Sequence, residues 1–178
     1  MISPYTTFDN SSAFRQLELN STHDALWTVE NFALGETNET RTINVAGNSV
    51  SSSFLDMLPA HLEIAPNSKY VASEKVSIRR LEDVFGDYVP TGEKVMLKSD
   101  TQGYERNVLL GSGNVLSSID LVLLELSLRP LYAGDLSVTE AIELMEDFSF
   151  VPVSLEPGFT DITTGSQLQA NIIFQKVA

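Results

Sequence analysis

The stretch EKVMLKSDTQGYERNVLLGSG, residues 93–113, decides the fold that we expect for this chain. A short apolar run at 95–97 leads into Asp100, and the polar turn 101–103 follows. From Tyr104 onward the apolar residues are spaced to share one face of a helix. The pattern predicts a strand, a turn and a helix, with Asp100 at the carboxyl end of a parallel strand. Open α/β sheets bind their ligands at such ends.

On both sides of this stretch, predicted strands alternate with predicted helices. Strands are predicted at 5–9, 27–34, 41–45, 75–79, 121–126, 150–155 and 169–177, and helical segments after Ser11 or Ser12, at 81–85 and after a capping box at Ser137 and Glu140. Residues 51–73 are expected to form a long excursion with one helical turn. The alternation favours an α/β fold with a mostly parallel sheet.

The last two predicted strands are expected to differ from the others. The segment 156–168 between them has no helical pattern, and a parallel crossover normally contains a helix. We therefore expect these two strands to form an antiparallel hairpin at the C-terminal end. Pro152 indicates an edge position for the first of them.

Composition limits the classes of protein and partner. The 178 residues suit one domain, so we treat 1–178 as a single unit. The absence of cysteine excludes disulfides, thiolate metal sites and cysteine nucleophiles. No apolar run approaches the roughly 18 residues that span a bilayer, and the first residues lack the pattern of a secretory signal, so we expect a cytoplasmic protein. A net charge of −13 disfavours nucleic acid and anionic membrane surfaces as partners.

The segment LKSDTQGYERNVLLGS, residues 97–112, resembles the central motif of FkbM-type methyltransferases, which depend on S-adenosylmethionine. Four further segments are similar to the family in the same order: NFALGE at 31–36, VSIRRLEDV at 76–84, LELSLRPLYAGD at 124–135 and GSQLQANIIFQ at 165–175. The resemblance implies a class I methyltransferase-like, Rossmann-like fold, with a mostly parallel sheet and the C-terminal antiparallel hairpin.

The chain also departs from the family pattern. The family begins with a strand and a Gly-rich cofactor loop, whereas the first residues here already resemble its second strand, with Phe8-Asp9-Asn10 where the family has Phe-Glu-Pro. We therefore expect a domain that lacks the first strand and is truncated at its N-terminal end relative to the family. Two strand edges would then need a partner, which predicts a possible homo-oligomer. Asn171 stands where the family often has Asp.

The resemblance implies several contacts with S-adenosylmethionine. Asp9 would accept hydrogen bonds from both ribose hydroxyls, although it can equally belong to a helix N-cap region. Asn31 and Ala33 would border the adenine, and the alternative is an ordinary strand end. Asp100 would contact the amino group of the cofactor.

Asp100 is also the first candidate for catalysis, because it can orient a methyl acceptor or take its proton. Its alternative role is to cap the following helix. Glu125 interrupts the apolar run 121–126 and would line the acceptor pocket beside Asp100, or pair with Lys98 or Arg129. The predicted contacts with the methyl acceptor are Gln102, Glu105, Arg129 and Tyr132; the helix dipole alone would also explain an acid at Glu105.

Three functions are compatible with these residues. The first is transfer of a methyl group from S-adenosylmethionine to an oxygen, or as the less favoured alternative a nitrogen, of a small molecule or sugar. The second is a non-catalytic, truncated methyltransferase fold that survives as a fragment or as an oligomer. The third is a hydrolase with a metal held by Asp100, Glu105 and Glu125, since hard cations prefer oxygen ligands. His23 and His61 are too isolated in the sequence to predict a metal site.

Overall fold

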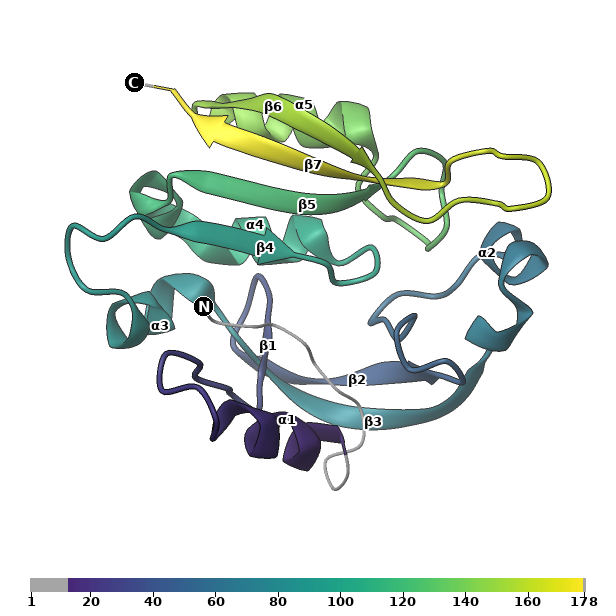
Figure 1. The fold of residues 1–178 in the computed structure, drawn as a ribbon, viewed down its shortest axis with the longest axis horizontal. Coiled ribbons are helices and arrows are strands. Elements are labelled where there is room, and N and C mark those ends of the chain that lie inside the picture. The colour runs from purple at the N-terminus through teal and green to yellow at the C-terminus, as the bar shows by residue number, and fades with distance from the viewer. Residues whose placement is uncertain (1–12, 178) are drawn as a thin grey trace.

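The computed structural model describes residues 13–177 of the chain (Figure 1). Its elements in chain order are α1 (Ala13–Ser21), β1 (Ala33–Leu34), β2 (Glu39–Ala46), α2 (Pro59–Ile64), the 3₁₀ helix η1 (Pro66–Ser68), β3 (Tyr70–Arg79), α3 (Leu81–Tyr88), β4 (Met96–Ser99), α4 (Glu105–Ser112), the 3₁₀ helix η2 (Gly113–Ser118), β5 (Leu121–Ser127), α5 (Val138–Asp147), β6 (Phe150–Pro157) and β7 (Gln169–Lys176). The predicted strand 5–9, the N-cap at Ser11 or Ser12 and the cofactor contact Asp9 lie outside the described residues.

The described strands form two mixed sheets. A three-stranded sheet has the order β1-β3-β2, in which β1 pairs with β3 in parallel and β2 with β3 antiparallel. A four-stranded sheet has the order β4-β5-β7-β6, in which β4 and β5 are parallel. β7 lies antiparallel to both β5 and β6. The α/β class is confirmed, but the single, mostly parallel sheet is not confirmed in the part of the chain that the structure describes.

Local chemistry explains where the elements differ from the predictions. The predicted strand 27–34 shrinks to the two residues of β1, and a turn that begins at Asp24 includes its first residue, Trp27. The Asp24 backbone oxygen accepts a hydrogen bond from the Trp27 N–H at 3.0 Å, and its side chain accepts one from the Leu26 N–H at 2.9 Å. Between β2 and β3, α2 packs over a separate apolar cluster through Ile64 rather than across the sheet. β3 therefore returns directly beside β2, in the opposite direction.

The main core lies between the four-stranded sheet and the helices α4 and α5, which are behind that sheet in Figure 1. Alternate residues of β5 and β7 point into it: Val122, Leu124, Leu126, Ala170, Ile172 and Phe174 are all buried. The predicted capping box is confirmed at α5, where the Glu140 N–H donates to the Ser137 hydroxyl and the Ser137 N–H donates to the Glu140 carboxylate. β6 is the outermost strand, as Pro152 predicted.

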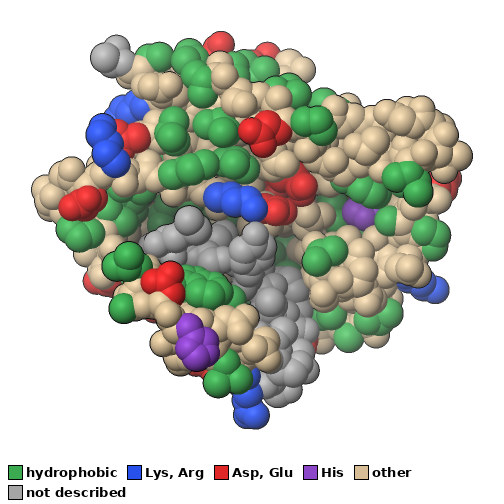
Figure 2. All heavy atoms as spheres, viewed as in Figure 1, with side chains coloured by type: hydrophobic (Ala, Val, Ile, Leu, Met, Phe, Trp, Pro, Cys, Tyr) green, Lys and Arg blue, Asp and Glu red, His purple; other side chains and the backbone are tan. Residues whose placement is uncertain are grey.

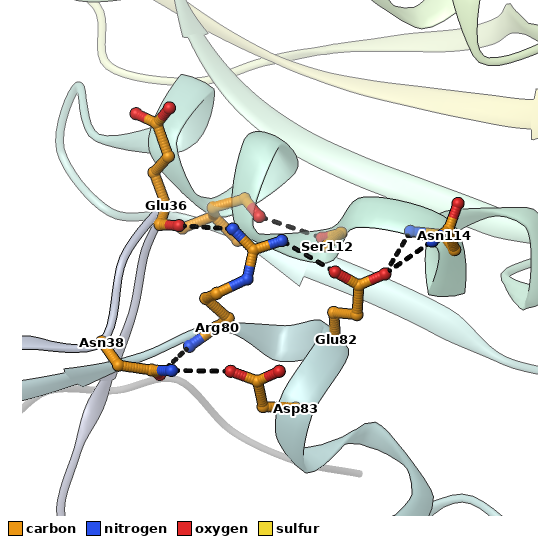
Figure 3. Close-up of polar contacts among 8 residues, drawn as sticks. Glu36, Asn38, Arg80, Glu82, Asp83, Ser112 and Asn114 are labelled. Carbon is orange, nitrogen blue, oxygen red and sulfur yellow. Dashed lines mark hydrogen bonds and ion pairs between the residues drawn. The ribbon is translucent and has the colours of Figure 1, made fainter.

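A polar network joins the two sheets (Figure 3). The Arg80 guanidinium donates to the Glu36 backbone oxygen at 2.8 Å and to the Glu82 carboxylate at 2.7 Å. Glu82 in turn accepts hydrogen bonds from both the backbone and the side-chain N–H of Asn114. The Arg80 N–H donates to the side chain of Asn38 at 2.9 Å. These bonds fix the start of α3 to the loop after β1 and to η2.

The second apolar cluster holds the 51–68 excursion against the loop after β5. Its buried members are Leu131, Tyr132 and Leu168. His61 of α2 is buried beside them, with its ring edge-on to that of Tyr132 at 5.2 Å between centroids. Burial lowers the pKa of His61, which favours its neutral form. No helix in the described part of the chain is long and apolar enough to cross a membrane.

Candidate functional site

Asp100, Gln102 and Glu125 meet at the carboxyl end of β4. Asp100 follows Ser99, the last residue of β4, and Glu125 follows Leu124, the β5 residue paired with Ser99. The Gln102 side-chain amide donates hydrogen bonds to Asp100 Oδ1 at 3.1 Å and to Glu125 Oε2 at 2.8 Å. The parallel pairing of two neighbouring strands therefore brings both predicted catalytic carboxyl groups to one place, bridged by one amide.

The two carboxyl groups have different surroundings. Burial first, then the charge of Asp100 and a hydrogen bond with Asp100, raise the pKa of Glu125 to about 7. Asp100 has a cation beside it, since Lys98 Nζ lies 3.4 Å from Asp100 Oδ2. Glu125 can therefore hold a proton at a pH at which an ordinary glutamate is ionised. Such a pair can accept a proton at Asp100.

The turn that carries Gln102 has an unusual backbone. Gln102 has φ of 53° and Gly103 has φ of 93°, both in the left-handed region. The Ser53 hydroxyl donates to the Gln102 backbone oxygen at 2.7 Å, which fixes the turn from the excursion side. A Cβ at Gly103 would lie 3.1 Å from atoms of Leu55, Tyr132 and Asp135. Packing from two other segments therefore holds the turn in this conformation.

Tyr132 and Gln169 complete the surroundings of the carboxyl pair. The Tyr132 side chain is fully buried, and its hydroxyl donates to Gln102 Oε1 at 2.9 Å. The Gln169 amide donates to Glu125 Oε2 at 3.2 Å. Sequence reasoning missed Gln169, although its place opposite Ser127 in the antiparallel pairing of β5 and β7 puts it on the same face as Glu125. The predicted contact between Tyr132 and an acceptor stays a prediction.

Glu105 lies inside the turn. Its side chain is 1% exposed, and its Oε1 accepts hydrogen bonds from the Thr101 N–H at 2.8 Å and the Thr101 hydroxyl at 3.0 Å. Burial raises its pKa to about 7, against the opposing effect of the Thr101 N–H. Glu105 therefore fastens the start of α4 to the turn, and its predicted contact with an acceptor stays a prediction.

Replacing Glu105 with glutamine is expected to flatten the pH dependence of stability. An unfolded glutamate loses its proton near pH 4.5, whereas the buried Glu105 keeps it up to about 7. The stability from this group is therefore complete below pH 4.5 and is lost as the pH rises through 7, by about 3 kcal/mol. Urea unfolding at pH 5 and pH 8 measures the free energy of unfolding at each pH. Between these two pH values, Glu105→Gln should lose less of that free energy than the wild type does, by about the contribution of Glu105.

Glu140→Gln is the matched control, because Glu140 also lies in the first turn of a helix but is exposed. Hydrogen bonds from Ser137 lower the pKa of Glu140, so its titration affects stability only below pH 4.5. The control should keep the wild-type difference between pH 5 and pH 8. If the wild type, Glu105→Gln and Glu140→Gln all showed the same difference in stability between pH 5 and pH 8, the raised pKa of Glu105 would be contradicted.

The remaining predicted site residues are not part of this cluster of contacts. Arg129 is exposed in the loop after β5. Asn31 is exposed just before β1, and Ala33 is buried in β1, where it pairs with Ile78 of the other sheet. Their roles stay predictions.

Asp100, Glu105 and Glu125 do not support the metal-dependent alternative. Across residues 13–177, no group of three or more histidine or acidic side chains is arranged to hold a metal ion. Each of the three carboxyl groups is instead engaged by a neighbouring side chain or backbone N–H.

A cavity of about 230 Å³ lies along β4, separate from the carboxyl pair. It is bounded by Leu34 of β1, Phe85 of α3, and Leu97 and Lys98 of β4, and most of its lining side chains are apolar. Its volume is below the roughly 300 Å³ at which small-molecule pockets begin.

Comparison with known proteins agrees with the motifs of the sequence. No curated protein and no solved structure matched the chain. A family model described as the methyltransferase FkbM domain matches residues 4–152, which include the strand, turn and helix that carry Asp100, Gln102 and Glu105 and the strand that carries Glu125. Because this match extends over most of the 178 residues, the chain belongs to the FkbM methyltransferase family.

Proposed function

We propose that the chain transfers a methyl group from S-adenosylmethionine to a hydroxyl oxygen of a small molecule or sugar. The observation that carries the proposal is the pair formed by Asp100 and Glu125 at the carboxyl end of β4, inside the part that matches the family. A hydroxyl group must lose its proton as it attacks, so it needs a base. In this proposal Asp100 is that base, and Glu125, whose pKa is raised to about 7, lies beside it.

The described residues fit part of the cofactor. S-adenosylmethionine carries positive charge on its sulfonium and amino groups, and the end of β4 presents acidic groups with one lysine beside them. The cavity along β4 includes Leu34 of β1 in its lining, which is mostly apolar. These features support Asp100 as a contact of the amino group and the neighbourhood of Ala33 as a contact of the adenine.

The cofactor would supply an electrophilic methyl group. The chain itself would hold the acceptor hydroxyl beside Asp100, whose carboxylate takes the hydroxyl proton as the new carbon–oxygen bond forms and the carbon–sulfur bond breaks. Glu125 would help to hold Asp100 in place through the Gln102 amide that both carboxyl groups bind. Positioning is the larger contribution in such a displacement, because the reacting atoms must be aligned.

Calorimetric titration with S-adenosylmethionine tests the cofactor assignment. We expect saturable binding that weakens in Asp100→Asn, because that variant removes the charge opposite the amino group. The matched control, Asp120→Asn, removes a carboxylate from the opposite end of the same strands and should bind as the wild type does. Equal binding by both variants would argue against a contact between Asp100 and the cofactor.

A second candidate function is a non-catalytic fold that assembles with another copy of itself. The observation that favours it is the position of β4 at the end of the four-stranded sheet, where its outer edge pairs with no other described strand. Light scattering separates the two functions, since this candidate predicts a dimer without cofactor binding. A monomer that binds S-adenosylmethionine would contradict it.

A further inference from the structure

The side-chain amide of Gln102 forms hydrogen bonds with three neighbouring side chains. Its nitrogen donates to Asp100 and Glu125, and its oxygen accepts from the Tyr132 hydroxyl at 2.9 Å. In the opposite orientation the amide oxygen would face both carboxyl groups and could accept only from a protonated Glu125, so the hydrogen bond to Asp100 would be lost. The orientation with the nitrogen toward the carboxyl groups therefore makes more hydrogen bonds, and its oxygen end contacts the Tyr132 hydroxyl, which also lies 3.3 Å from the Ser51 backbone oxygen.

The backbone at Tyr132 is held in place by the side chain of Asp135. Asp135 Oδ2 accepts hydrogen bonds from the Leu131 N–H at 3.0 Å and from the Tyr132 N–H at 3.2 Å. The Tyr132 ring packs edge-on against His61, and the side chain is fully buried. A hydroxyl so enclosed cannot contact an acceptor in this structure, but it can act through the amide that it touches.

We propose that Gln102 and Tyr132 are positioning residues: the buried Tyr132 hydroxyl orients the Gln102 amide, and the amide holds Asp100 and Glu125 in one fixed arrangement. The proposal reassigns both residues from contact with the acceptor to support of the acidic pair. It rests on the proposed function only in naming Asp100 as the reacting carboxylate. The hydrogen bonds themselves can be tested without cofactor or acceptor.

This role explains the backbone of the turn. A left-handed φ of 53° is costly for a residue with a Cβ, and a glycine would avoid the cost. A glycine would also remove the amide. The Ser53 hydroxyl, which donates to the Gln102 backbone oxygen, helps to hold the conformation. The turn therefore keeps a glutamine at a strained backbone position, from which its one amide reaches both carboxyl groups.

The test is a pH titration of the side-chain carboxyl carbon of Glu125 by NMR, with no ligand present. The wild type should titrate near pH 7. The Gln102 amide lowers the pKa of Glu125 by donating to it, so Gln102→Met should raise the midpoint, by roughly one pH unit. Tyr132→Phe should raise it in the same direction, because the amide loses its fixed orientation. The double variant should shift no further than Gln102→Met alone.

Tyr70→Phe is the matched control. The Tyr70 hydroxyl donates to the backbone oxygen of Leu55 at 2.7 Å, in the same excursion, but does not bond to Gln102. A purely structural role of Tyr132 would make the two tyrosine variants alike, both less stable and both with the wild-type midpoint. That result would overturn the proposal, and so would a shift in Gln102→Met that Tyr132→Phe does not share. Gln102 lies on the partly exposed turn, so its variant tests the amide even if Tyr132→Phe fails to fold.

Discussion

Gly111→Ala is expected to lower the free energy of unfolding by about 3 kcal/mol. A Cβ on Gly111 would overlap the backbone oxygen of Gly35 and lie 2.6 Å from its carbonyl carbon. Backbone atoms cannot rotate away as a side chain can, so α4 would have to move from the end of β1. Such a movement would disturb Val108 and Leu109, which α4 buries in the main core.

Gly86→Ala is the control for this effect. Gly86 lies in α3, and a Cβ there would meet nothing within 4 Å. Alanine is a better helix former than glycine by up to about 1 kcal/mol, so the control should be more stable than the wild type. Urea denaturation measures both variants. A Gly111→Ala protein as stable as the wild type would show that α4 does not approach β1 closely.

Asp100→Asn is expected to slow methyl transfer by roughly 10²- to 10⁴-fold, the usual contribution of a positioned base. Asparagine keeps an oxygen that can accept from the Gln102 amide, so the turn should stay folded while the proton acceptor is lost. The measurement is the rate of labelled-methyl incorporation into a hydroxyl acceptor at saturating cofactor, which separates this loss from weaker cofactor binding.

Asp120→Asn is again the control, now for activity. Asp120 bonds to Lys94 at 2.6 Å and to the Val95 N–H at 2.9 Å, at the end of the sheet away from Asp100. Its substitution should leave the transfer rate unchanged. Equal rates for the wild type and Asp100→Asn would remove Asp100 from the chemistry.

The strand, turn and helix of 93–113 could be predicted because their signals are local. An apolar run predicts β4. The apolar residues Val108 and Leu109 predict which face of α4 is buried. The continuous apolar run at 121–126 likewise gives β5. The acidic pair follows from these two strands alone, since parallel neighbours bring their carboxyl ends together.

The rest of the site depends on contacts between distant segments. The hydrogen bond between Tyr132 and Gln102 spans 30 residues, and that between Gln169 and Glu125 spans 44. No local pattern in a loop indicates such a partner. The division into two sheets was equally hidden, because it depends on pairing between strands far apart in the chain, such as β1 with β3. Burial of Glu105 has the same origin: a first-turn acid is normally exposed, and here neighbouring segments cover it.

One measurement tests the central claim most directly: incubation of the wild-type chain with methyl-labelled S-adenosylmethionine and a panel of sugars, alcohols and amines, followed by mass spectrometry of the products. The account predicts a labelled methyl group on the oxygen of at least one hydroxyl compound, formed only with enzyme. Transfer to amines alone, or no transfer to any member of the panel under conditions in which the cofactor binds, would contradict it.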